Sequence, residues 1–101
     1  MINKLNSKQR AKLKSISSTY ETIFQIGKNG IGEELIKQLS DALNKRELIK
    51  IRVLETCEYD AKEASIVIAE KTLSEVVQVI GSKIILFRQN DDPKKRVISL
   101  A

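Results

Sequence analysis

Histidine is absent from this chain of 101 residues, and Cys57 is its single cysteine. Without histidine there is no Ser-His or Cys-His nucleophile, no histidine general base and no imidazole ligand for a metal. One cysteine can form no intramolecular disulfide and cannot anchor a structural zinc site alone. These absences predict a protein that is not an enzyme, with no catalytic residue, no metal site, no cofactor and no small-molecule substrate.

Long apolar runs and aromatic side chains are also scarce. No apolar run approaches the roughly 18 residues that a membrane-spanning helix needs, and the N-terminus lacks the apolar core of a signal peptide. The aromatic residues are Tyr20, Phe24, Tyr59 and Phe87. Three of them fall in or beside expected core elements. We therefore expect a cytoplasmic protein with no membrane partner and no aromatic platform for stacking nucleic-acid bases.

The chain does have a balance of apolar and charged residues that suits one compact domain. Apolar residues make up 42% and charged residues 31% of the sequence, which leaves enough side chains to bury a modest core. Residues 1–101 are therefore predicted to form a single domain, with a tail from about residue 90.

Positive charge is concentrated at the start of the chain. The net charge is +5, and residues 21–101 sum to zero, so the whole excess lies in residues 1–20. That segment has no acid, and its cations are Lys4, Lys8, Arg10, Lys12 and Lys14. A segment with charge of one sign favours a polyanionic partner.

The same basic segment is predicted to form the first helix. The helix would run from Ser7 to about Ser18, with Asn6 or Ser7 as its N-cap. Its apolar stripe consists of Leu5, Leu13, Ile16 and Tyr20. Flanking that stripe are Lys4, Lys8 and Lys12, and farther round lie Arg10 and Lys14. A charged face of this kind either solvates the helix or contacts a polyanion.

Two more helices and four strands are expected. Apolar residues at helical spacing predict helices over 33–45 and 60–72, the second opened by a capping box of Asp60 and Glu63. Strands are predicted at 21–26, 47–54, 75–80 and 83–88. The strand at 47–54 alternates, with Ile49, Ile51 and Val53 on one face and Lys50 and Arg52 on the other.

The last two strands should form a hairpin. Gly81-Ser82 has the composition of a two-residue turn. A regular register from that turn pairs Val77 with Leu86 and Val76 with Phe87, so that the first pair lies on one face and the second on the other. Both faces are apolar, and we expect helices to cover both, with the first helix on the face of Val76 and Phe87.

The predicted element order is helix, strand, helix, strand, helix, strand, strand. Two strand–helix–strand crossovers make the strands they join parallel, and the hairpin adds an antiparallel strand. The predicted fold class is therefore α/β, an α+β sandwich of two or three layers with a mixed four-stranded sheet. The tail contains Pro93 and is expected to be mobile or to pair at a sheet edge.

A loop with the sequence Gly27-Lys28-Asn29-Gly30 separates the first strand from the second helix. Glycines at such a turn can expose backbone N–H groups to an anion, but they can also serve chain geometry alone. The loop is too short for a nucleotide-binding P-loop and lacks the Gly-Lys-Ser/Thr ending. Glu33 and Glu34 would compete with a phosphate at the helix N-terminus. We therefore expect an anion to bind at the loop and Lys28, beside the cations of the first helix.

Four ordered motifs, spread over about residues 5–90, carry a resemblance to a known family. They are Ser7-Lys8-Gln9-Arg10, Gln25-Ile26-Gly27-Lys28-Asn29-Gly30-Ile31, Glu47-Leu48-Ile49-Lys50-Ile51, and the run from Val77 to Arg88. Together they resemble the CRM-domain family (chloroplast RNA splicing and ribosome maturation), whose free-standing bacterial form is the YhbY-like RNA-binding protein of ribosome assembly. Members of that family often have Thr in place of Gly32 and a small residue such as Gly in place of Leu73.

The resemblance implies an α-β-α-β-α-β-β fold similar to the C-terminal domain of translation initiation factor three. It also implies binding to rRNA of precursor large ribosomal subunits, with ribosomal proteins as further partners, through a loop compared with the G-x-x-G loop of KH domains. The RNA-binding residues would then be Gly27, Lys28, Asn29, Gly30, Lys8 and Arg10, to which the basic first helix adds Lys12 and Lys14. The alternative function is a protein-interaction module on ribosomal particles, using an apolar sheet face or the tail.

Overall fold

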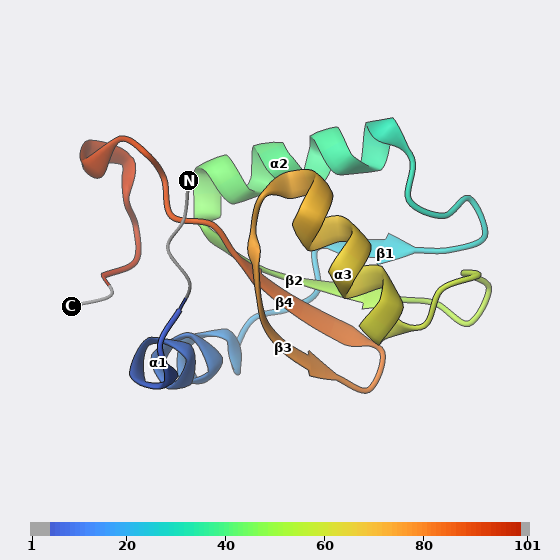
Figure 1. Cartoon of the computed structure of the whole chain (residues 1–101), viewed down its shortest axis with the longest axis horizontal. Coiled ribbons are helices and arrows are strands. Elements are labelled where there is room, and N and C mark those ends of the chain that lie inside the picture. Colours follow the sequence, from blue (N-terminus) through green and yellow to red (C-terminus); the bar gives the residue numbers. More distant parts are fainter. Residues whose placement is uncertain (1–4, 100–101) are drawn as a thin grey trace.

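The computed structural model describes residues 5–99, which contain three α-helices and a four-stranded sheet in the predicted order (Figure 1). The helices are α1 (Ser7–Ser17), α2 (Glu33–Arg46) and α3 (Ala61–Thr72). The strands are β1 (Phe24–Ile26), β2 (Leu48–Val53), β3 (Glu75–Ile80) and β4 (Lys83–Phe87), and a short 3-10 helix, η1 (Pro93–Lys95), follows them. Of the predicted basic residues, Lys4 lies outside the described part of the chain.

Side-chain caps define where two of the helices begin. The Asn6 side chain accepts a hydrogen bond from the Gln9 N–H at 2.8 Å, while the Gln9 side chain accepts one from the Asn6 N–H at 3.1 Å. Asp60 and Glu63 form the same reciprocal pair at the start of α3, which confirms the predicted capping box. The N-cap of α2 is Gly32, which provides no side-chain hydrogen bond.

The sheet is mixed, as predicted, with the strand order β1-β2-β4-β3. β1 runs parallel to β2, whereas β4 lies antiparallel to both β2 and β3. β1 is shorter than the predicted strand at 21–26, because regular pairing with β2 begins only at Phe24. The Ile23 N–H donates to the Lys50 carbonyl at 2.9 Å, and regular pairing with β2 covers only Phe24–Ile26.

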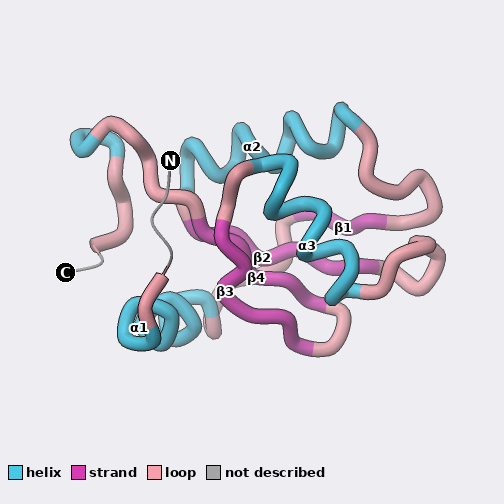
Figure 2. The backbone as a smooth tube through the Cα atoms, in the orientation of Figure 1, coloured by secondary structure: helices cyan, strands magenta, loops and turns pink. Residues whose placement is uncertain are grey.

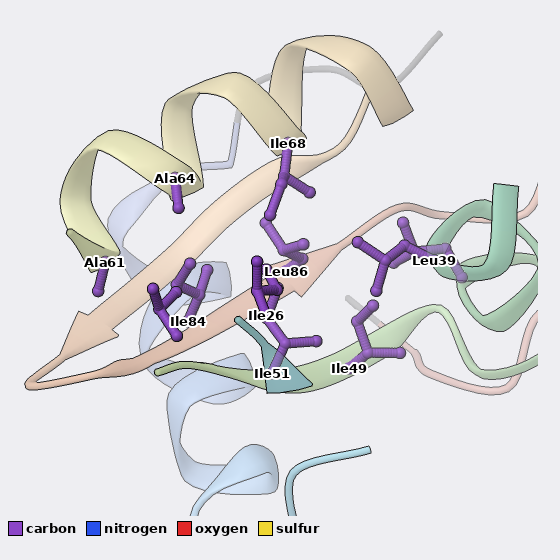
Figure 3. Packing of buried hydrophobic residues seen from close by; sticks show 11 residues of the cluster. Ile26, Leu39, Ile49, Ile51, Ala61, Ala64, Ile68, Ile84 and Leu86 are labelled. Carbon is purple, nitrogen blue, oxygen red and sulfur yellow. The ribbon is translucent and has the colours of Figure 1, made fainter. Parts of the chain in front are cut away.

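Helices cover both faces of the sheet, which gives a three-layer sandwich (Figure 2). α2 and α3 pack on one face, over a core that includes Ile26, Leu39, Ile49, Ile51, Ile68, Ile84 and Leu86 (Figure 3). α1 covers the other face, hereafter the α1 face, where Leu13 is fully buried with Leu48 and Phe87. Burial of a side chain of this size contributes about 1.5–3 kcal/mol, so Leu13 is a main anchor of α1.

The predicted register of the β3–β4 hairpin is wrong away from the turn. A β-bulge between Val76 and Gln78 shifts the ladder, so that Val76 pairs with Leu86 instead of Phe87. As a result Val77 packs in the core beneath α1, whereas Val76 packs against the core beneath α2 and α3. Two adjacent valines fit either register equally well, so the alternation of residue types could not reveal the inserted residue.

The C-terminal tail packs on the domain, in place of the mobile or edge-pairing tail expected from the sequence. Ile98 is buried in the core of the α1 face together with Leu5. The backbone N–H groups of Val97 and Ile98 donate to a carboxylate oxygen of Glu47 at 2.7 and 3.0 Å. A buried carboxylate therefore holds the tail on the domain, and the part of the tail that the structure describes does not pair at a sheet edge.

Candidate nucleic-acid interface

The Gly27–Gly30 loop is a tight turn beyond β1, at one end of the long axis of the molecule (Figure 1). The Gly30 N–H donates to the Gly27 carbonyl at 3.0 Å, and Lys28 and Asn29 are exposed at the tip of the turn. Within residues 5–99, no protein group accepts a hydrogen bond from the backbone N–H of Lys28 or Asn29. The tip therefore presents two peptide donors and one ammonium group to an anion.

Both glycines of the loop have a geometric reason to be glycine. Gly30 has a φ of 70°, which other residues adopt only at a cost. A Cβ on Gly27 would lie 3.3 Å from the Thr56 hydroxyl oxygen and 3.7 Å from a methyl carbon of Leu54, because the loop between β2 and α3 lies alongside (Figure 2). Chain geometry thus accounts for the glycines, and Lys28 is left as the side chain that brings charge to the loop.

A row of exposed side chains crosses the sheet beside this loop. Gln25 of β1 pairs with Arg52 of β2, which pairs with Lys83 of β4, which in turn pairs with Ile80 of β3. All four side chains are exposed. Paired residues in neighbouring strands point to the same face of a sheet, and in β2 that is the face of Lys50, the α1 face. We call these four residues the exposed row.

α1 covers the α1 face only as far as Lys50. The Lys50 side chain is only 9% exposed, and its ammonium group donates to the carbonyl oxygens of Ser17 and Tyr20 at 3.2 and 3.1 Å. Arg52 lies two residues farther along β2, about 7 Å in an extended strand, and is exposed. Sequence alternation places Lys50 and Arg52 on one face but does not reveal which of them the helix covers. Arg52 and Lys83 were therefore missing from the predicted site.

The cations of α1 differ in what they contact. Lys8, Lys12 and Lys14 are exposed. Arg10 is half-buried, and its guanidinium donates to the carbonyl oxygens of Val76 and Val77. One guanidinium nitrogen of Arg10, Nη1, is therefore hydrogen-bonded within the fold.

The loop does not lie beside α1, contrary to the expectation from the sequence. Figure 1 shows α1 and the Gly27–Gly30 loop well apart, toward opposite ends of the molecule. The exposed row lies between them on the α1 face, because it occupies the end of β2 that leads toward the loop, beyond the part that α1 covers. The predicted residues of the loop and of α1 therefore do not form one compact site.

Arg88 belongs to the scaffold. Its guanidinium donates to the carbonyl oxygens of Thr72 and Ser40, both at 2.7 Å, and to the side-chain oxygen of Asn44 at 2.8 Å. Burial lowers the pKa of the Arg88 guanidinium from its ordinary value, and the nearby Asp91 carboxylate acts in the opposite direction. These contacts join the ends of α2, α3 and β4.

The described residues contain no group of three or more His, Cys, Asp or Glu side chains placed to hold a metal ion. No helix in residues 5–99 is long and apolar enough to cross a membrane. The candidate binding groups on the described surface are therefore exposed cations and backbone N–H donors. Together, the fold and this surface define a small α/β domain of a class suited to binding polyanions.

The family follows from comparison with known proteins. Residues 5–88 match the CRS1 / YhbY (CRM) domain, and the chain belongs to this family, which confirms the resemblance seen in the sequence. The match includes all three helices, the sheet and the Gly27–Gly30 loop, and it ends before the C-terminal tail.

Relatives of similar length come from several bacteria. The chain is 37% identical over 91 residues to the "Probable RNA-binding protein YqeI" of Bacillus subtilis, covering 90% of this chain and 95% of YqeI. It is 30% identical over 98 residues to the "Probable RNA-binding protein PA4753" of Pseudomonas aeruginosa, covering 96% and 93%. The solution structure of SAV1595 from Staphylococcus aureus matches with a TM-score of 0.76 and 44% identity, over 95% of this chain and 100% of SAV1595.

Proposed function

We propose that this protein is a non-catalytic RNA-binding protein that contacts the RNA backbone with the α1 face of its sheet. The observation that carries the proposal is the exposed row, whose cations Arg52 and Lys83 lie on that face beyond the part that α1 covers. Lys28 lies at the loop, Arg52 and Lys83 lie in the exposed row, and Lys8, Lys12 and Lys14 lie on α1. The names of the curated relatives support RNA as the polyanion.

Phosphate contacts would dominate this binding. Ammonium and guanidinium groups bind phosphate oxygens with charge-assisted hydrogen bonds, and the free peptide donors of Lys28 and Asn29 add neutral ones. None of the four aromatic side chains of the chain is fully exposed, so we expect base stacking to contribute little to binding. We therefore expect strong salt dependence and weak sequence preference.

We further propose that the RNA is rRNA of precursor large ribosomal subunits and that the protein acts there in the cytoplasm, with ribosomal proteins nearby. The family resemblance carried by the four sequence motifs supports this partner. In this proposal Gly27 and Gly30 shape the turn, whereas Lys28 and Asn29 make the contact.

Sedimentation of the tagged protein through a density gradient, at low and at high salt, tests the proposal. Co-migration with large-subunit precursors should be lost at high salt and after RNase treatment of the particle fractions. Co-migration that survives both treatments would favour the protein-interaction alternative. Absence of the protein from ribosomal particles at low salt would contradict the proposed partner.

The alternative of a protein-interaction module has less support. Both faces of the sheet are apolar, but helices cover them. The large exposed apolar side chains among the described residues come from α3 and its C-cap, the end of β3 and the tail, and are Ile66, Leu73, Ile80 and Val97. Apolar side chains exposed singly are ordinary on soluble proteins and do not define an interface.

A further inference from the structure

A second basic surface lies where the C-terminal tail folds back onto the end of α2. A groove of about 670 Å³ separates the two segments. We call it the tail groove; Asn44 and Lys45 form its α2 wall, and Asn90 with the basic run 94–96 forms its tail wall. Val97 also lines the groove, and within residues 5–99 no acidic side chain does so.

The tail groove is separate from the Gly27–Gly30 loop. In Figure 1 the tail lies next to the C-terminal end of α2, away from the Gly27–Gly30 loop at the other end of the long axis. The tail also follows residue 88, where the match to the CRM domain ends. The basic run in the tail is therefore a feature of this chain in addition to the family domain.

Glu47 holds the tail in place. Its side chain is fully buried, and both of its carboxylate oxygens accept hydrogen bonds from the tail backbone. One oxygen accepts from the Asn90 N–H at 2.6 Å, and the other accepts from the N–H groups of Val97 and Ile98 at 2.7 and 3.0 Å. Hydrogen bonds to an ionised acceptor are among the strong ones in proteins. The two ends of the tail wall are thus fixed by one side chain.

The backbone conformation of Glu47 is unusual for a residue with a side chain. The residue follows α2 with a φ of 62° and a ψ of −39°, and glycine adopts a positive φ far more readily than other residues do. A glutamate is strained there, and the three hydrogen bonds to its carboxylate offset that strain.

The cations of the tail wall are also held in place. The Arg96 Nε donates to the Asn90 carbonyl at 2.9 Å, and the Asn90 side chain donates to the Asn44 carbonyl of α2 at 3.0 Å. Asp92 caps η1 by accepting from the Lys94 N–H at 3.0 Å. The turn presents Lys94, Lys95 and Arg96 as exposed side chains along the groove.

We propose that the tail groove binds a second stretch of RNA backbone through its phosphates, and that Glu47 is the positioning residue that forms the groove. The proposal rests on the RNA-binding function proposed above. Cations at the end of α2, such as Lys45 and Arg46, also complement the negative end of the helix dipole. That simpler role does not extend to the three tail cations, which belong to another segment.

The test uses the full chain and a fluorescein-labelled oligouridine, with affinity measured by anisotropy over a range of salt concentrations. The variant K94Q/K95Q/R96Q removes the tail cations, which are all exposed. The matched control K37Q/K62Q/K71Q removes three exposed cations of α2 and α3, so that both variants lose the same net charge. With about 0.7 lost per phosphate contact to a single strand, the log–log salt slope should fall by roughly 2 in the tail variant and remain near the unmodified value in the control.

The variant E47Q tests the positioning role, because the expected change in RNA affinity is opposite to the change that net charge alone would cause. It makes the net charge more positive, which by itself would strengthen binding. We expect weaker binding and a smaller salt slope, because a glutamine offers one acceptor oxygen and turns an NH2 group toward the tail donors. Faster hydrogen exchange at Val97 and Ile98 should accompany this loss. If E47Q does not fold, E47D makes the same test of the positioning role, because it keeps the charge but shortens the side chain that reaches the tail donors.

The outcomes distinguish this inference from the proposed function. An equal salt slope in the tail variant and its control would overturn the tail groove and leave the proposed interface standing. Weaker binding in E47Q without faster exchange at Val97 and Ile98 would overturn the positioning role. Absence of binding by the unmodified protein at low salt would contradict the RNA-binding function on which the groove rests.

Discussion

The guanidinium of Arg10 in α1 donates a hydrogen bond of 3.1 Å to the carbonyl oxygen of Val77 in β3. A second hydrogen bond goes from the same nitrogen to the carbonyl oxygen of Val76. Both carbonyls lie at the β-bulge, where regular pairing with β4 is interrupted. Arg10 thus satisfies backbone groups at the bulge and ties the first helix to an edge strand.

Replacing Arg10 by Ala should lower the free energy of unfolding by about 1–3 kcal/mol, because the half-buried carbonyls lose a charged donor. Lys12 is exposed on the same helix, and Lys12→Ala should change stability by less than about 0.5 kcal/mol. Urea unfolding of both variants measures the difference. Equal stability of the two variants, with weaker RNA binding by Arg10→Ala, would mean that Arg10 acts as an RNA contact and not as a link.

Lys50 and Arg52 share one face of β2, yet their replacement should have opposite effects. Lys50→Met should reduce stability by about 1–3 kcal/mol, because two carbonyls at the end of α1 lose their donor. Arg52→Met should leave stability within about 0.5 kcal/mol and lower the salt slope of RNA binding by about 0.7. Thermal unfolding and salt-dependent anisotropy of the same two variants provide the measurements.

Two outcomes would contradict these predictions. If Arg52→Met binds RNA with an unchanged salt slope, the exposed row is not part of the interface. If Lys50→Met is as stable as the unmodified protein, the buried ammonium is not what holds the end of α1.

Alternation and helical spacing were sufficient to predict the element order and most of the core. The apolar stripe that includes Leu13 placed α1 correctly on the sheet. The register of β3 was not predictable, because Val76 and Val77 are chemically alike and the donor that supports the bulge, Arg10, lies more than sixty residues earlier in the sequence. The bulge depends on a tertiary contact between α1 and β3, which local sequence patterns do not show.

The candidate site was predictable in part for a related reason. The charges of Lys28 and of α1 are visible in the sequence, but their exposure is not. Which of Lys50 and Arg52 is exposed and can bind RNA depends on where α1 ends above the sheet. The position of the tail depends on Glu47, whose carboxylate gathers N–H groups from residues about fifty positions away.

Leu73 ends α3 in a left-handed conformation, with φ 54° and ψ 44°, and its side chain is 72% exposed. Left-handed backbone costs a residue with a Cβ about 1–2 kcal/mol, whereas glycine loses about 0.5–1 kcal/mol of chain entropy on folding. Leu73→Gly should therefore raise the free energy of unfolding by about 0.5 kcal/mol. Leu73→Ala keeps the Cβ and should bring no gain. A lower melting temperature for Leu73→Gly than for Leu73→Ala would contradict this account.

Charge and shape at the Gly27–Gly30 loop can be separated with two substitutions. Lys28→Ala removes an exposed ammonium group and should lower the salt slope of RNA binding by about 0.7 while stability stays within about 0.5 kcal/mol. Gly30→Ala leaves the charge intact but places a Cβ at a φ of 70°, which should cost about 1–2 kcal/mol or distort the turn. It should therefore weaken binding with little change in slope.

Gly30→Asn is the control for the second substitution, because asparagine tolerates left-handed backbone better than alanine and should retain more affinity. The two readouts then identify what the loop contributes. Lys28→Ala with unchanged affinity and slope would remove Lys28 from the interface. Weaker binding by Lys28→Ala at an unchanged slope would instead mean that the substitution had altered the turn, since a lost phosphate contact must appear in the salt dependence.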